Sequence, residues 1–142
     1  MGVKGIDHIG IAVESLEKSI PFYRDSLKLN FLGIEEVPSQ KVRVAMFSAG
    51  ESRIELLEPT SEDSPIAVTI RKRGQGMHHI AFSVDDISSQ VDSLKRNGIR
   101  MIDDEPRNGA GGTRIAFIHP AASGKVLTEL CEHSKVEKEN QQ

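Results

Sequence analysis

Residues 5–13 read GIDHIGIAV and residues 76–84 read GMHHIAFSV, so the chain carries two versions of one short segment. His8 and His79 occupy the same position in the two versions, 71 residues apart (79 − 8). The duplication therefore extends over two modules, because the same offset matches further apolar residues: Val13 with Val84, Leu16 with Ile87, Ile20 with Val91, and Tyr23 with Leu94.

The alternation of side chains in both segments predicts a β-strand. In the first segment His8 alternates with the branched residues Ile9 and Ile11, and a period of two places these on opposite faces. We expect the branched face to pack into the core. His8 then shares its face with Gly10, which leaves space for an imidazole to reach a cleft, and His79 has small neighbours in the same way.

A carboxylate inside an apolar strand recurs in the same manner. Glu55 lies in residues 54–57 (IELL) and Glu129 in residues 127–130 (LTEL), 74 residues apart (129 − 55). The three additional residues predict a small insertion in the second module, for which the glycine-rich residues 108–112 are the expected place.

The duplication thus supplies two histidines and two glutamates at equivalent positions. Unpaired carboxylates are costly to bury among apolar side chains, whereas a dication beside neutral histidines balances both charges. We expect His8, Glu55, His79 and Glu129 to bind a divalent ion such as Zn, Co, Ni, Mn or Fe.

Each of these residues also has an ordinary structural interpretation. A single strand histidine is more often hydrogen-bonded structure than a ligand, and a single strand glutamate usually faces solvent or protects an edge. Recurrence in both modules favours the metal site. Of the other histidines, we expect His78 to be structural, His119 to shape a turn or else contact substrate, and His133 to be solvated.

Capping and turn residues predict the order of the remaining elements. In the first module a helix of about three turns should follow Ser15, with an irregularity at Pro21. In the second module a helix should follow Asp86 and end at Gly98. The other expected elements are strands at residues 30–37, 42–47 and 52–58, a helix at 64–72, and strands at 99–102, 113–118 and 125–131.

This order indicates an α+β fold of two paired βαβββ modules that form an open eight-stranded trough. We expect a single domain over residues 1–132, with module 1 at 1–60, a linker helix at 61–75 and module 2 at 76–132. Residues 133–142 form a polar tail.

Composition excludes several classes of partner. The net charge is −3 with both signs interspersed, which argues against a nucleic-acid partner. The single cysteine, Cys131, has no partner for an internal disulfide, and the sequence shows neither a secretory signal pattern nor an apolar run long enough to span a membrane. We therefore expect a cytoplasmic protein that does not bind membranes.

The glycine-rich loop at residues 107–114 lacks the spacing of a Walker A motif or a dinucleotide fingerprint. Glycines nevertheless allow backbone amides to approach an anion. We expect a flexible lip of the trough, where Arg107 or Arg114 meets a negatively charged substrate.

Six runs of the chain match motifs of a known family. They are residues 7–13 (DHIGIAV), 55–59 (ELLEP), 63–67 (DSPIA), 76–82 (GMHHIAF), 117–120 (FIHP) and 124–130 (GKVLTEL). With them the sequence resembles the vicinal oxygen chelate (glyoxalase/bleomycin-resistance) superfamily and, within it, the methylmalonyl-CoA epimerase family. The resemblance covers residues 8–132, and the runs DSPIA and GMHHI are the most specific to the epimerases.

The resemblance implies inversion, from S to R or back, of the carbon between the carboxylate and the thioester of methylmalonyl-CoA, through a metal-stabilised enolate. It implies that Glu129 is both a metal ligand and the base for the α proton. Some family members carry a second, glutamate base on the third strand of the first module, but residues 42–47 (VRVAMF) contain no carboxylate. Glu55, or a metal-bound water, would take that part. A small-molecule acyl-CoA partner and a homodimer are implied as well.

Three alternatives remain open at this point. A glyoxalase I-type lactoylglutathione lyase shares the ligand pattern and differs in its substrate. An extradiol dioxygenase would use two histidines and one carboxylate, and the additional Glu55 argues against it. A non-catalytic small-molecule binding or resistance protein of the same fold would have no need of four ligands.

Overall fold

The computed structural model describes residues 2–134. They divide into two compact units: a central unit, His8–His78, and a flanking unit formed by the described residues up to Asp7 and from His79 onward. Strands β1 (Val3–Ala12) and β5 (Gly76–Val84) each run through a boundary between the units, which falls directly beside His8 and His79.

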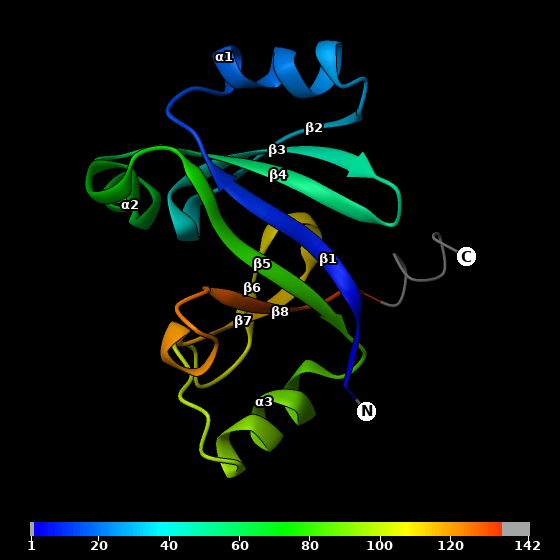
Figure 1. The fold of residues 1–142 in the computed structure, drawn as a ribbon. Coiled ribbons are helices and arrows are strands. Elements are labelled where there is room, and N and C mark those ends of the chain that lie inside the picture. Colours follow the sequence, from blue (N-terminus) through cyan, green and yellow to red (C-terminus); the bar gives the residue numbers. More distant parts are fainter. Residues whose placement is uncertain (1, 135–142) are drawn as a thin grey trace. The chain divides into compact units, whose positions relative to one another are not determined.

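The central unit contains one four-stranded sheet. Its strands follow the order β2-β3-β4-β1, with β1 parallel to β4 and the other neighbours antiparallel. Helix α1 lies over this sheet (Figure 1). The bounds are α1 (Leu16–Pro21), the π-helical turn η1 (Phe22–Ser26), β2 (Asn30–Val37), the 3-10 turn η2 (Pro38–Gln40), β3 (Val42–Ala49), β4 (Ser52–Pro59) and α2 (Pro65–Arg73).

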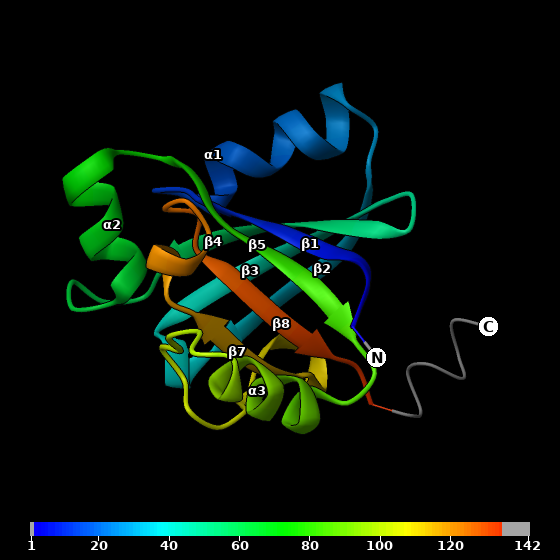
Figure 2. The ribbon, with the colours of Figure 1, turned by 60° about the horizontal axis from the view of Figure 1, so that its bottom comes forward.

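The flanking unit repeats this arrangement. Its strands follow the order β5-β8-β7-β6, with β5 parallel to β8, and helix α3 packs along β7 and β8 (Figure 2). The predicted α+β class with two βαβββ modules is confirmed. The bounds are α3 (Ile87–Arg96), β6 (Arg107–Asn108), the 3-10 turn η3 (Ala110–Gly112), β7 (Arg114–Ile118), the 3-10 turn η4 (Pro120–Ala122) and β8 (Thr128–Glu132).

Each unit has its own apolar core, and the repeat fills both cores from equivalent positions. The central core consists of Val13, Leu16, Ile20, Ala45, Phe47 and Leu56, and the flanking core of Val84, Ile87, Val91, Ala116, Ile118 and Leu130. Phe47 is the largest fully buried side chain, and the rings of Tyr23 and Phe31 lie within 5.7 Å of its ring centre. The duplication read from the sequence therefore describes the packing of the molecule.

The first helix is irregular where proline predicts it. Ser15 caps α1 by accepting a hydrogen bond from the backbone N–H of Lys18, and the α-helix ends at Pro21. The next five residues continue as the π-helical turn η1. The proline removes one backbone donor and displaces the preceding carbonyl, so the regular ladder does not continue. In the flanking unit α3 has no such residue, begins at its Asp86 cap and is followed by Gly98 at φ 80°.

Two expectations about strands were wrong. Residues 99–102 form only a single bridge, Met101 with Ile118, and the edge strand is instead β6. The side chain of Asp103 accepts the backbone N–H of Phe117 at 2.9 Å, which replaces a ladder bond and ends the pairing. Strand β8 begins three residues late, at Thr128, because Lys125 has a left-handed φ of 71° and closes a turn onto Pro120.

The insertion in the second module was also placed wrongly. The core positions Phe47 and Ile118 keep the offset of 71 (118 − 47), yet their strand partners Ile54 and Thr128 are 74 apart (128 − 54). The three additional residues therefore lie between β7 and β8, where η4 forms, and not in the glycine-rich loop. A hairpin end tolerates extra residues because no core side chain changes its face.

No helix in the described part of the chain is both long enough and apolar enough to cross a bilayer.

Candidate functional site

His8 and Glu55 meet inside the central unit. They come from the parallel neighbours β1 and β4, and the pairing places Glu55 opposite Gly10, two residues beyond His8. Side chains two apart share a face, and Gly10 has none to occupy the space between. His8 Nδ1 lies 3.3 Å from Glu55 Oε2, and both residues are 4% exposed.

His79 and Glu129 meet in the flanking unit by the same construction. Strands β5 and β8 are parallel, and Ala81, two residues beyond His79, pairs with Glu129. His79 Nε2 lies 3.7 Å from Glu129 Oε1, and both side chains are buried. The predicted face that His79 shares with small residues is confirmed, since Phe82 and Val84 pack on the opposite, core side.

Each pair thus forms a half-site of one imidazole and one carboxylate. Their neighbours differ. In the central unit Arg53 Nη2 lies 3.7 Å from the Glu55 carboxylate, which offsets part of its charge. In the flanking unit the Phe117 ring stands edge-on to His79 with ring centres 5.5 Å apart, and the Arg107 guanidinium lies 5.7 Å from the centre of that same ring. The Phe117 ring therefore restricts how His79 turns.

The half-sites fit a divalent ion by donor chemistry and by spacing. An ion about 2.1 Å from both ligand atoms, with an angle between about 90° and 109°, would hold the nitrogen and oxygen about 3.0–3.4 Å apart. The observed separations are 3.3 and 3.7 Å. Buried carboxylates beside imidazoles also carry the negative charge that a cation would balance.

The remaining histidines have different environments. His78 is largely buried, and burial together with the positive charge of Arg73 lowers the pKa of its imidazole to about 4. His119 accepts the backbone N–H of Ala121 through Nδ1 at 3.0 Å, so the turn role expected for it is confirmed. The expectation that His133 is solvated was wrong: its side chain is 10% exposed and contacts Asp7, because the end of β8 runs past β1 within the flanking unit.

The glycine-rich loop places its two arginines differently. Arg107 makes an ion pair with Asp103 at 3.0 Å and is partly covered, while Arg114 is exposed. Strand β3 carries no acidic residue, so no carboxylate of that strand supplements Glu55.

Two acidic residues escaped the sequence interpretation although they follow the same repeat. Glu58 Oε2 accepts the backbone N–H of Leu16, the first residue of α1, at 2.7 Å. Glu132 Oε1 accepts the backbone N–H of Ile87, the first residue of α3, at 3.0 Å. Glu58 and Glu132 are 74 residues apart (132 − 58), the offset of the half-site glutamates, and this spacing could have identified them. The last strand of each unit therefore both carries a half-site glutamate and anchors the helix of its unit.

The profile of the Glyoxalase/Bleomycin resistance protein/Dioxygenase superfamily matches residues 7–117 of this chain. The chain is 48% identical to "Uncharacterized protein YqjC" of Bacillus subtilis (strain 168) over 127 residues, which cover 89% of this chain and 91% of that protein. It is 40% identical over 126 residues to "Methylmalonyl-CoA epimerase, mitochondrial" of Mus musculus, covering 88% of this chain and 71% of the mouse protein.

A solved structure agrees with these relatives. A variant of Streptomyces coelicolor methylmalonyl-CoA epimerase in complex with 2-nitronate-propionyl-CoA superposes with a TM-score of 0.91 at 39% identity, covering 95% of this chain and 98% of that one. The glyoxalase-type fold expected from the sequence is thereby confirmed. The chain belongs to the glyoxalase/bleomycin resistance protein/dioxygenase superfamily and, within it, groups with the proteins named methylmalonyl-CoA epimerase.

Proposed function

We propose that this protein epimerises methylmalonyl-CoA between its S and R forms, with His8, Glu55, His79 and Glu129 as the ligands of one divalent ion. The observation that carries the proposal is the matched pair of buried half-sites, each built from a histidine and a glutamate at equivalent strand positions. The relatives named methylmalonyl-CoA epimerase support the choice of substrate. A homodimer and residence in the cytoplasm remain predictions.

The reaction breaks one C–H bond and forms another on the opposite face of the same carbon. We assign removal of the α proton to Glu129, whose carboxylate is held by β8 beside His79. The planar enolate that results has lost the configuration of that carbon. We assign delivery of a proton to the other face to Glu55, because β3 offers no acidic side chain. Two acid/base groups on opposite sides of one carbon are the minimum that inversion requires.

A divalent ion bound between these ligands would supply Lewis-acid polarisation of the thioester and carboxylate oxygens, a contribution of several kcal/mol. The protein's own part is positional. The parallel strand pairs set each glutamate two residues beyond its histidine, and burial of all four side chains keeps competing water away.

The test is incubation of the protein, loaded with Co²⁺ or Zn²⁺, with one epimer of methylmalonyl-CoA in heavy water. We expect deuterium to enter the α carbon and the second epimer to appear. The glutathione adduct of methylglyoxal is run in parallel, and turnover of that adduct alone would transfer the assignment to a lactoylglutathione lyase. Absence of exchange with both substrates from a protein with bound metal would refute a catalytic role.

Two variants separate the assigned roles. Glu129→Gln should reduce exchange from one epimer by at least about 100-fold, while Glu55→Gln should retain that exchange and lose inversion. The exposed Glu62→Gln is the matched control for a lost carboxylate. Metal content and far-UV circular dichroism of each variant show whether a loss comes from the reacting group or from an altered protein.

A further inference from the structure

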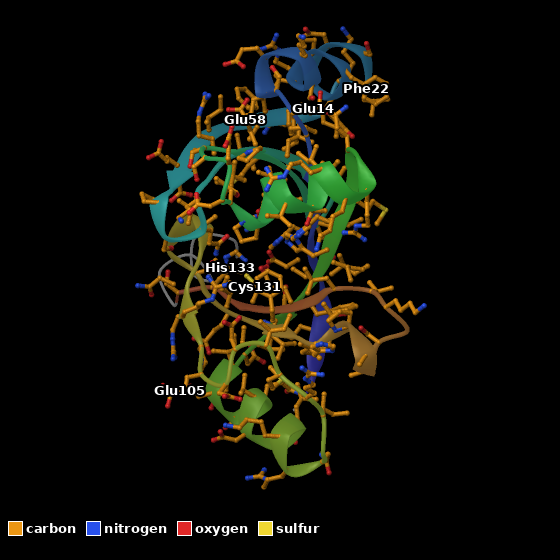
Figure 3. All side chains as sticks on the ribbon, turned by 90° about the vertical axis from the view of Figure 1, so that its left-hand side faces the viewer. Glu14, Phe22, Glu58, Glu105, Cys131 and His133 are labelled. Carbon is orange, nitrogen blue, oxygen red and sulfur yellow. The ribbon has the colours of Figure 1, made fainter. Side chains whose placement is uncertain are left out.

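A second cluster of ligand-type side chains lies within the flanking unit, apart from the half-site of that unit. It consists of Asp7 on β1, Cys131 on β8 and His133 directly after β8. One ligand atom from each residue lies within 4.8 Å of the other two. Figure 3 shows Cys131 and His133 close together at the end of β8.

The cluster is held in place by the sheet and by a neighbouring hydroxyl. Cys131 and His133 are two residues apart, which directs both to the same side of the strand. His133 Nε2 lies 2.5 Å from Asp7 Oδ1, a contact between residues 126 positions apart in the chain. Ser83 Oγ donates to the same carboxylate oxygen at 3.3 Å and thereby orients it, as the outer partners of metal ligands commonly do.

The three ligand types match a thiophilic dication. Thiolate, imidazole and carboxylate are the ligands that Zn²⁺ takes in proteins, and a site of three protein ligands is completed by a water. Deprotonated Cys131 and Asp7 carry two negative charges, which a dication beside a neutral imidazole cancels. Cancellation matters here because Asp7 is 8% exposed and Cys131 is 1% exposed.

We propose that Asp7, Cys131 and His133 form a second metal site, distinct from the proposed catalytic one, that binds Zn²⁺ or a similar divalent ion. Its role is structural. Binding releases the thiol proton to solvent and joins the N-terminal strand to the last strand of the flanking unit. The same three side chains could form a nucleophilic triad, but a sulfur buried to this degree is closed to a substrate, and a closed site suits a structural ion.

The test is titration of metal-free protein with Co²⁺ under reducing conditions, followed by absorption spectroscopy. Coordination of Co²⁺ by a thiolate produces a charge-transfer band in the near ultraviolet. Cys131 is the only cysteine of the chain, and the proposed catalytic ligands contain no sulfur, so this band reports the second site alone. We expect the band to appear in the wild-type protein, to be displaced by Zn²⁺, and to accompany binding of a second equivalent of metal.

Variants assign the ligands. Cys131→Ser should lose the band and one equivalent of metal, and His133→Ala should weaken Co²⁺ binding at this site by at least about 10-fold. Glu55→Gln, which alters only the proposed catalytic site, should keep the band. A folded wild-type protein that binds Co²⁺ without a thiolate band would overturn the proposal, and so would His133→Ala with unchanged affinity. Neither result depends on epimerase activity, so this site and the proposed function fail separately.

Discussion

Replacement of Glu58 by alanine should destabilise the protein by detaching helix α1 from β4. The Glu58 carboxylate accepts the N–H of Leu16 at 2.7 Å and lies 3.0 Å from Arg43 Nη1. The Leu16 N–H belongs to the first helical residue, which has no acceptor within its own helix. Leu16 is 0% exposed, so water does not readily replace the lost acceptor.

The magnitude follows from these two contacts. A hydrogen bond to a charged acceptor contributes about 1.5–3 kcal/mol, and a partly exposed ion pair about 0.2–1 kcal/mol. We therefore expect Glu58→Ala to lower the free energy of unfolding by about 2–3 kcal/mol. For a chain of 142 residues the unfolding entropy is about 0.3 kcal/mol/K, so the melting temperature should fall by roughly 7–10 °C. Glu58→Gln keeps an acceptor and loses the charge, and should cost about half as much.

Urea unfolding followed by far-UV circular dichroism measures these differences. Glu132→Ala is the matched variant in the flanking unit, where the acceptor of the Ile87 N–H is lost, and it should cost about 1.5–2.5 kcal/mol. Glu62→Ala removes an exposed carboxylate and should change stability by less than about 0.5 kcal/mol. If Glu58→Ala and Glu62→Ala had equal midpoints, the carboxylate would not anchor the helix.

Three further variants test individual contacts. Ser64→Ala removes the fully buried cap of α2 and should cost about 1 kcal/mol in urea unfolding; the same midpoint as wild type would contradict the cap. The pKa of His78 is lowered to about 4 by burial and by Arg73, so the unfolded chain takes up a proton first and stability should fall as the pH drops from about 6.5 to about 4. His78→Gln should flatten this part of a stability profile by about 2 kcal/mol, and an unchanged slope would refute the assignment. Gly109→Ala places a Cβ 2.7 Å from Ile115 Cγ2 and should lower the melting temperature at a cost of about 1–3 kcal/mol, whereas an unaltered melting curve would show that the loop yields freely.

Local structure was predictable where neighbouring residues decide it. Strand β2 has the expected bounds, as does β5, and the caps of the helices are the expected Ser15, Ser64 and Asp86. Alternation and capping act over a few residues, so the sequence records them directly. The edge strand of the flanking unit was misjudged because Asp103 takes the N–H of Phe117, and no local pattern announces a side chain that replaces a ladder bond.

The half-site residues were predictable for a different reason. A duplication states that His8 and His79, or Glu55 and Glu129, have equivalent surroundings, and equivalence is visible in one sequence without knowledge of the strand order. Register then explains the pairs, since each glutamate stands opposite the residue two beyond its histidine. Arg53 and Phe117, which flank the half-sites, have no counterpart in the repeat and became apparent only in the structure.

The sequence by itself determined the two modules, their cores and the identity of the four proposed ligands. Only the tertiary structure decided which distant polar groups meet, as Asp7 does with His133 and Glu58 with the start of α1. The physical reason is that contacts over 126 or 42 residues depend on strand neighbours and on where each strand ends, and these follow from packing of the whole sheet.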